Sequence, residues 1–288
     1  MDRIEPNFDA ALESAHFPGA RGAVLHRVSH AVGHGDTIAR VVLLPGYGDH
    51  AGRYADCMRY LARRGVACHA LDFRGQGKSD GRRGYVQRWD DYLDDLDALL
   101  ALEVVRAPVE TPLYLVGHSH GGLVAAAAII RGRVKMNGAV LCAPYLATKF
   151  RVPVTKRALA CVADRCVPWL RIATGMSDAW ITSDPAMLAE TRADPLVNHC
   201  ATPRWFVGMR RVQDEVRRRA GELTCPLMTL VAEEDRIVDA EVIRAFHERA
   251  GSAPKTLVGY PNGRHELLRE SFRERVFADV LRWVAERD

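Results

Sequence analysis

The chain has 288 residues, of which 48% are hydrophobic and 26% charged, and 40 basic against 36 acidic residues give a net charge of +4. This composition excludes a disordered, collagen-like or coiled-coil protein, and the small, unclustered basic excess argues against nucleic-acid binding. No apolar run reaches the roughly 18 residues of a membrane-spanning helix, and the N-terminus has acids where a signal peptide needs a basic start. We therefore expect a cytoplasmic enzyme with one large domain, or one domain with an insertion.

Short apolar runs alternate with amphipathic stretches along the chain, a pattern typical of a mostly parallel sheet connected by crossover helices. The expected strands, in chain order, are 41–44, 68–71, 113–116, 138–142, 227–231 and 256–260. The expected helices are 53–64, 89–105, 121–131, 238–249 and 266–286. We expect the acids near the start of the second helix to form a solvated face, because the helix dipole favours negative charge there.

The alternation stops between about residues 146 and 223, where no strand-like run occurs. The stretches with helical spacing in this region are 159–170 and 204–219. Asp-Pro pairs, the first at 184–185, predict loops between them. We therefore expect residues 1–145 and 224–288 to form an α/β core, and residues 146–223 to form a helical cap inserted between two core strands. Such a cap is expected over the carboxyl edge of the strands, where open sheets place their sites.

The sharpest chemical signal follows the strand 113–116 and is Val116-Gly117-His118-Ser119-His120-Gly121-Gly122. It is a G-x-S-x-G pattern between a strand and a helix, which is the context that a nucleophilic serine needs. The strained turn lifts the hydroxyl above the sheet, and the helix N-terminus offers amide hydrogens to a developing oxyanion. The alternative interpretation is an ordinary glycine-rich turn.

A serine hydroxyl is a weak nucleophile until a base removes its proton, so a histidine and an orienting carboxylate should follow. Asp235 comes just after the strand 227–231, and His265 comes just after the strand 256–260. All three side chains could therefore meet above one edge of the sheet. Other candidates for the acid are Glu233, Glu234 and Asp239, and position favours Asp235.

A second oxyanion donor is expected in the loop after an early strand. Residues 43–50, Leu-Leu-Pro-Gly-Tyr-Gly-Asp-His, form such a loop. We expect the backbone N–H groups of Tyr47 and His120 to hold the oxyanion together.

Three other sequence patterns are weaker indications of a functional site. His26, His30 and His34 recur every four residues, but nearby glycines argue against a helix that would align them as metal ligands, so we expect a surface segment and no metal. The Gly-Lys-Ser at 77–79 lacks the first glycine of a P-loop, so no nucleotide or other cofactor is expected. The seven cysteines have no CxxC pattern and are expected to be free thiols, with a disulfide between Cys161 and Cys166 as the alternative.

These segments together resemble the α/β-hydrolase superfamily and, within it, the monoacylglycerol lipase and lysophospholipase group of the serine aminopeptidase S33 type. The resemblance runs from about residue 22 to the end. The segments that carry it are 45–54, 72–81, 117–122, 194–197, 235–236 and 263–266. Two of them, the Gly-x-x-x-Gly-Arg-Tyr tail of the first and the Arg-Gly-x-Gly-x-Ser within the second, are more specific to the lipase-like group than the serine motif.

The resemblance implies an α/β-hydrolase fold and a carboxylic-ester hydrolase acting on a lipid monoester, with the cap forming an acyl tunnel. By position, Asp49 and Arg53 are candidates to meet a polar glycerol-like head group, or else to form a salt bridge within their loop. The family usually has His-Gly where this chain has Pro45-Gly46, often has a small residue at Tyr47, and commonly has Met or Gln at His120. Because of these departures, the resemblance does not define the length of the acyl chain in the substrate.

Two further alternatives concern partners and reaction. The cap segment 149–171 interleaves six basic residues with apolar ones, so it could touch lipid aggregates or an anionic membrane, or could instead be a solvated helix with a core-facing stripe. The same triad could serve a proline iminopeptidase, a short-chain carboxylesterase or, without catalysis, a binding protein. The sequence leaves the oligomeric state undefined.

Overall fold

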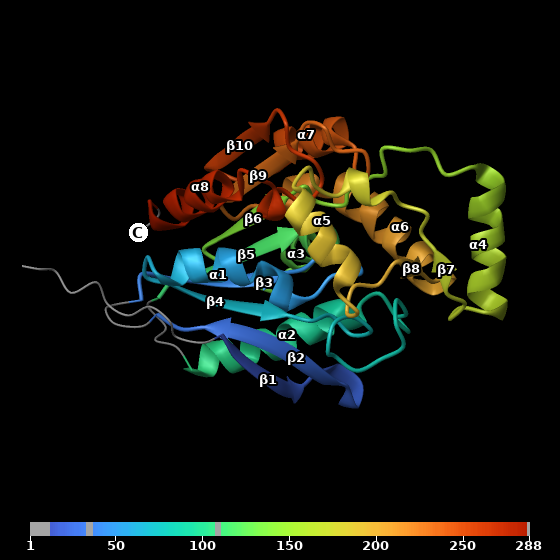
Figure 1. Cartoon of the computed structure of the whole chain (residues 1–288), viewed down its shortest axis with the longest axis horizontal. Helices are drawn as coiled ribbons and strands as arrows, with labels where there is room; N and C mark the ends of the chain where they lie inside the picture. The colour runs from blue at the N-terminus through green and yellow to red at the C-terminus, as the bar shows by residue number, and fades with distance from the viewer. Residues whose placement is uncertain (1–11, 33–36, 107–110, 287–288) are drawn as a thin grey trace, which may run out of the picture.

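The computed structural model describes residues 12–32, 37–106 and 111–286, and its centre is an eight-stranded sheet (Figure 1). The strand order is β1-β2-β4-β3-β5-β6-β9-β10. The strands are β1 (Glu13–Pro18), β2 (Val24–His30), β3 (Ala39–Leu44), β4 (Val66–Leu71), β5 (Leu113–His118), β6 (Gly138–Cys142), β9 (Leu227–Ala232) and β10 (Lys255–Tyr260). The run from β4 to β10 is parallel, while β1 and β2 are antiparallel to their neighbours. This is the expected mostly parallel sheet of an α/β-hydrolase.

Helices cover both faces of the sheet. The helices of the described residues are α1 (Ala55–Ala62), α2 (Asp91–Arg106), α3 (His120–Ile130), α4 (Val154–Cys166), α5 (Pro185–Ala193), α6 (Pro203–Arg218), α7 (Ala240–Arg249) and α8 (Arg273–Ala285). Helices α1 and α8 pack together on one face, and α2 and α3 pack together on the other (Figure 1). No helix in the described part of the chain is long and apolar enough to cross a membrane.

The parallel strands bring distant loops to one edge. Strands β3, β5, β6 and β9 are buried along their whole length, as expected for a parallel sheet covered on both faces. Leu44 at the end of β3 pairs with Gly117 near the end of β5, and Tyr260 at the end of β10 pairs with Ala232 at the end of β9. Because these strands end in register, the loops that follow them share the carboxyl edge.

The two antiparallel strands were not expected from the sequence, because β2 carries polar residues that are nevertheless buried. His26 and His30 are 3% and 4% exposed, so the expected surface segment is wrong for both residues. The ring of His26 lies 2.8 Å from Asp72 and 2.6 Å from Ser14. His34 lies outside the described residues, and within them no group of three or more His, Cys, Asp or Glu side chains could hold a metal ion.

The expected solvated acidic face of α2 is also partly wrong. Asp91 and Asp95 are fully buried, because Arg74 from the loop after β4 reaches both of them, with N–O distances of 3.7 Å and 2.5 Å. Pairing with a guanidinium is what allows a carboxylate to be buried.

The segment between β6 and β9 contains α4, α5 and α6 and a two-stranded sheet of β7 (Ile172–Ala173) and β8 (Cys200–Ala201). The expectation of a loop at 184–185 is wrong. Asp184 is the N-cap of α5, its carboxylate accepts from the N–H of Ala186 at 2.9 Å, and Pro185 occupies the first helical position. An Asp-Pro pair is therefore a helix start here, because proline has no N–H to leave unpaired.

Candidate active site

Ser119 lies at the sharp turn between β5 and α3, with φ of 51° and ψ of −113°. A non-glycine residue with positive φ is strained, and the surrounding glycines explain how the turn is tolerated. A Cβ atom on Gly121 would lie 2.0 Å from the carbonyl oxygen of Leu44, and one on Gly117 would lie 2.5 Å from that of Gly121. Only glycine at these two positions lets α3 approach the strands closely enough to hold the serine.

The backbone of Ser119 is also fixed by its neighbours. Its N–H donates to the carbonyl of Cys142 at 3.0 Å, and its carbonyl accepts from Leu123 at 3.1 Å and Tyr145 at 2.9 Å. The turn is therefore held from the end of β6 and from the loop that follows it as well as from α3.

The three residues expected to form a triad lie together. Nε2 of His265 is 2.8 Å from Oγ of Ser119, and Nδ1 of His265 is 2.7 Å from a carboxylate oxygen of Asp235. The other carboxylate oxygen of Asp235 accepts the N–H groups of Ile237 at 2.7 Å and Val238 at 2.9 Å. The three side chains are almost fully buried.

Burial and charge act in opposite directions on this pair. Burial disfavours the ionised form of Asp235, but His265 and the two backbone amides hold the pKa of this carboxyl below its usual range. Burial likewise disfavours the imidazolium, but the adjacent Asp235 raises the pKa of His265 above its ordinary value. The carboxylate therefore stabilises the cation that forms when His265 takes a proton.

The two residues expected to form the oxyanion hole flank Ser119. A Cβ atom on Gly46 would be 3.6 Å from Cβ of Ser119, so the loop after β3 lies against the nucleophile. His120 is the first residue of α3. Within the described residues, neither the N–H of Tyr47 nor that of His120 donates to another protein group.

His118, the residue before the nucleophile, is a site residue that the sequence analysis did not predict. Its Nε2 is 3.1 Å from the carbonyl of His265, and its Nδ1 is 2.9 Å from the hydroxyl of Tyr54. Burial lowers the pKa of His118 to about 4, so the ring is neutral near pH 7. His118 therefore supports the backbone of the loop that carries His265.

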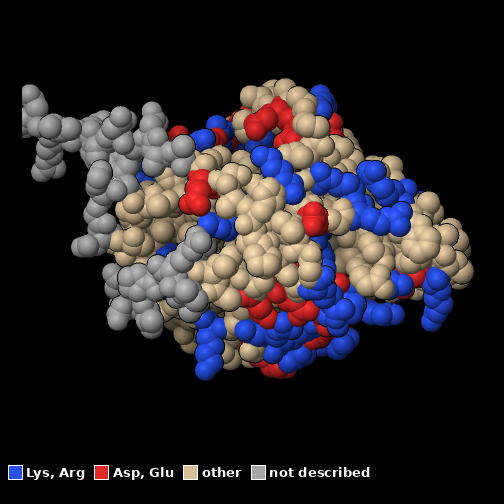
Figure 2. All heavy atoms as spheres, turned by 90° about the horizontal axis from the view of Figure 1, so that it is seen from below, with Lys and Arg blue, Asp and Glu red and all other residues tan. Residues whose placement is uncertain are grey.

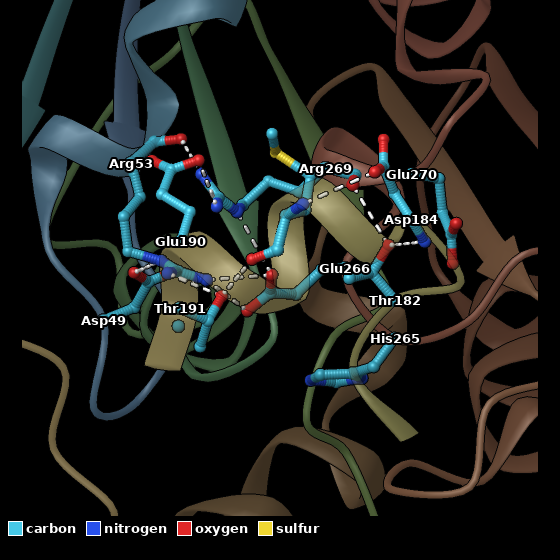
Figure 3. A network of polar contacts seen from close by, with 12 residues as sticks. Asp49, Arg53, Thr182, Asp184, Glu190, Thr191, His265, Glu266, Arg269 and Glu270 are labelled. Carbon is cyan, nitrogen blue, oxygen red and sulfur yellow. Dashed lines mark hydrogen bonds and ion pairs between the residues drawn. The ribbon is translucent and has the colours of Figure 1, made fainter. Parts of the chain in front are cut away.

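The candidates for head-group contacts belong to a buried ion network beside His265 (Figure 3). Arg53 pairs with Asp49 at 2.5 Å and with Glu266 at 3.0 Å, and Arg269 pairs with Glu266 at 3.3 Å. Thr191 of α5 accepts from Arg53 at 2.9 Å. The salt bridge considered between Asp49 and Arg53 is thus present. Glu266, which directly follows His265, was not singled out because its partner is 213 residues away.

A cavity opens beside Ser119 and His265 and is lined by both the core and the inserted segment. Its polar lining includes Asp49, Arg53, Thr191 and Glu266, which contact one another in the ion network. The apolar lining from the inserted segment includes Phe150, Val152, Met176, Ile181, Val197 and Phe206. The arrangement can hold an ester with its carbonyl at the serine, a polar group at one end and an apolar chain beneath the inserted helices.

The other sequence expectations have mixed outcomes. Cys161 and Cys166 are free thiols, so the alternative of a disulfide between them is wrong. Asp239, a rival for the acid, caps α7 by accepting the N–H of Glu241 at 3.1 Å. Another rival, Glu233, forms an ion pair with Arg244.

Comparison with known proteins agrees with this geometry. The family model described as serine aminopeptidase, S33, matches residues 35–271. The monoacylglycerol lipase of Mycolicibacterium smegmatis is 30% identical over 274 residues, covering 93% of this chain and 95% of that protein. The human monoglyceride lipase is 27% identical over 260 residues, covering 86% and 83% of the two chains.

Solved structures show the same fold. The Saccharomyces cerevisiae monoglyceride lipase, crystallised with a substrate analogue, has a TM-score of 0.85 at 22% identity, covering 96% of this chain and 95% of that one. The Paleococcus ferrophilus monoacylglycerol lipase has a TM-score of 0.81 at 24% identity, covering 92% and 99%. The chain therefore belongs to the serine aminopeptidase S33 family and is an α/β-hydrolase of the monoglyceride lipase type.

Proposed function

We propose that the protein is a serine hydrolase that cleaves the carboxylic ester of lipid monoesters, as a monoacylglycerol lipase or lysophospholipase does. The observation that carries this proposal is the line from Ser119 through His265 to Asp235, with contacts of 2.8 Å and 2.7 Å, at the mouth of a largely apolar cavity. The relatives named monoacylglycerol lipase and monoglyceride lipase support the same reaction. No cofactor or metal enters the proposed mechanism.

In the proposed cycle, His265 takes the proton of Ser119 as its oxygen attacks the ester carbonyl, and Asp235 stabilises the imidazolium. The N–H groups of Tyr47 and His120 stabilise the oxyanion. His265 then gives its proton to the departing alcohol, leaving the acyl group on Ser119. Water, deprotonated by His265, attacks the acyl-enzyme and releases the fatty acid, and the proton returns to the serine.

The polar and apolar linings of the cavity indicate the kind of substrate. We propose that Asp49 and Arg53 meet the hydroxyl groups of a glycerol-like head, since both belong to the polar lining and a salt-bridged pair still has oxygen and N–H groups to offer. The cavity volume of about 230 Å³ is below the roughly 300–1,000 Å³ typical of ligand pockets. This volume favours a monoester with one acyl chain over a triester.

We further propose that residues 146–223 act as a cap, residues 1–145 and 224–288 as the core, and that the cap touches anionic lipid surfaces as a peripheral contact from the cytoplasm. Helix α4 has no buried residue, so the alternative of a core-facing stripe finds no support. Its apolar side chains Val154 and Leu159 are 75% and 68% exposed. Its one acid, Asp164, is paired with Arg204. Basic side chains are prominent on the part of the surface towards the cap, at the right of Figure 2.

The catalytic proposal is tested with Ser119→Ala on a panel of monoacylglycerols, lysophospholipids, short p-nitrophenyl esters and an aminoacyl naphthylamide. We expect the wild type to prefer monoacyl esters and to be labelled by a fluorophosphonate, and the variant to lose both activities while remaining folded. Preferred cleavage of the naphthylamide would favour a proline iminopeptidase. Wild-type turnover by the variant would refute the nucleophile.

The surface proposal is tested by flotation with phosphatidylglycerol and phosphatidylcholine liposomes at low and high salt. Binding to the anionic vesicles at low salt, weakened by salt and by Lys156→Glu together with Arg157→Glu, is the expected result. Absence of flotation with anionic vesicles at low salt would end this part of the proposal.

A further inference from the structure

The side chain of Tyr47, which is bulky where the related lipases often have a small residue, is held by the cap. Its ring stacks on the indole of Trp205, a residue of α6, with centroids 3.6 Å apart and planes inclined by 27°. Its hydroxyl oxygen lies 2.9 Å from the carbonyl oxygen of Gly84 and 3.0 Å from that of Cys200, and the two carbonyls share its one proton. Two of these three partners, Trp205 and Cys200, belong to the inserted segment.

The ring of His120, the second residue proposed for the oxyanion hole, lies against the same indole. The ring centroid of His120 is 5.8 Å from that of Trp205 and 5.9 Å from that of Tyr47, which it meets edge-on at 80°. Trp205 is only 5% exposed and His120 only 1%. Both residues proposed to form the oxyanion hole therefore have side chains packed against one residue of the cap.

The backbone of the oxyanion loop is also attached to the cap. The N–H of Asn198 donates to the carbonyl of Gly48 at 2.8 Å, and a Cβ atom on Gly48 would lie 2.3 Å from the carbonyl oxygen of Asn198. Two residues further along the loop, the ring of His50 lies 2.7 Å from the carboxylate of Asp194. The loop after β3 is thus fixed along its length by the cap segment that ends at α6.

We propose that Trp205 is a positioning residue of the oxyanion hole, through which the cap sets the direction of the Tyr47 and His120 N–H groups. The proposal rests on the oxyanion assignment made above. Stabilisation of an oxyanion depends on donors fixed at the right place before the reaction, and loss of one donor typically lowers kcat by about 10²–10³-fold. Loss of the stacking between Tyr47 and Trp205 should therefore lower kcat by part of that factor and leave substrate affinity largely unchanged.

The experiment compares Trp205→Ala with Trp205→Phe and with Val216→Ala. Val216 is a buried residue of the same helix, eleven positions and so about 16 Å further along it, and it controls for a weakened α6. With p-nitrophenyl butyrate we expect Trp205→Ala to lower kcat about 10–100-fold with KM within about threefold. Trp205→Phe should recover most of kcat, and Val216→Ala should keep it within about twofold.

A trifluoromethyl ketone provides the readout that a general packing defect would not move. The Oγ atom of Ser119 adds to its carbonyl carbon, the serine proton passes to His265, and the alkoxide formed occupies the oxyanion hole. Its inhibition constant should rise in Trp205→Ala by the same factor by which kcat falls. An unchanged inhibition constant, or a kcat within about twofold of the wild type, would overturn the proposal.

A second variant covers the case in which Trp205→Ala does not fold. Tyr47→Phe keeps the stack and removes the hydroxyl contacts with Gly84 and Cys200, and we expect a smaller fall in kcat, about threefold to tenfold, with KM unchanged. Unaltered kcat in this variant would contradict the role of the cap. If Ser119→Ala lacks activity while both variants behave as wild type, only the positioning proposal fails. If Ser119→Ala retains activity, the function itself fails.

Discussion

His265 carries the pH dependence of the proposed reaction, because its imidazole must be neutral to accept the serine proton. Asp235 raises the pKa of His265 above the ordinary value of about 6.5. As the pH falls through this raised pKa the ring becomes charged and the base is lost. We therefore expect the acid limb of the kcat/KM profile to have its midpoint above pH 6.5.

The profile is measured with a neutral p-nitrophenyl ester, and Asp235→Asn is its control. Removing the carboxylate charge should lower kcat by about 10⁴-fold, as in other triads, and should move the midpoint of the residual activity towards lower pH. A wild-type midpoint below pH 6.5 would contradict the assigned influence of Asp235.

The sequence predicted a site residue only where that residue follows a strand. Ser119, Asp235 and His265 each follow a parallel strand. Because parallel strands end at the same edge of a sheet, the sequence predicts that these residues meet there. Glu266 and Trp205 could not be found in this way, because their partners Arg53 and Tyr47 are far away in sequence. The contact of Trp205 also depends on how the inserted segment folds back.

Helix α3 lies close against the end of strand β3 at Gly121, and this contact sets a limit on substitution. In Gly121→Ala the new methyl group would lie 2.0 Å from the backbone oxygen of Leu44, which cannot move without shifting β3. We expect a loss of about 3 kcal/mol in the free energy of unfolding, together with a large loss of activity because Ser119 begins the same turn.

Urea denaturation followed by circular dichroism measures this loss, with Gly221→Ala as the matched control. At Gly221 the nearest atom to a new Cβ is 3.8 Å away, an ordinary contact, so the change should stay within about 1 kcal/mol. Equal urea midpoints for the two variants would show that α3 can move away from β3.

At the level of helices and strands, the hydrophobic pattern predicted the elements that local sequence can encode. The parallel strands are rich in apolar residues, and all six were expected within a few residues of their ends. Strand β2 was missed because His26 and Ser29 are buried through side-chain partners rather than through apolar character. Helix α5 was missed because the proline that starts it was interpreted as a loop signal.

On the scale of the whole molecule, several titratable groups among the described residues are buried, and His120 is one whose burial no charge or hydrogen bond offsets. It is 1% exposed, neither ring nitrogen has a hydrogen-bond partner within the described residues, and burial lowers its pKa to about 3. The unfolded chain binds a proton at about pH 6.5, so between pH 6.5 and about 3 the unfolded state holds the extra proton. Stability must therefore fall as the pH falls through this range.

His120→Phe isolates this contribution, because an aromatic ring can still fill the cluster formed with Tyr92, whose centroid is 4.9 Å away. One proton accounts for about 1.4 kcal/mol per pH unit, so the free energy of unfolding of the variant should fall less steeply between pH 6 and 4 by about this slope. The lowered pKa of Asp235 acts mainly below this range and the raised pKa of His265 above it. Urea unfolding at intervals across this range measures the slopes, and parallel curves for the two proteins would mean that the His120 ring is protonated in the folded state.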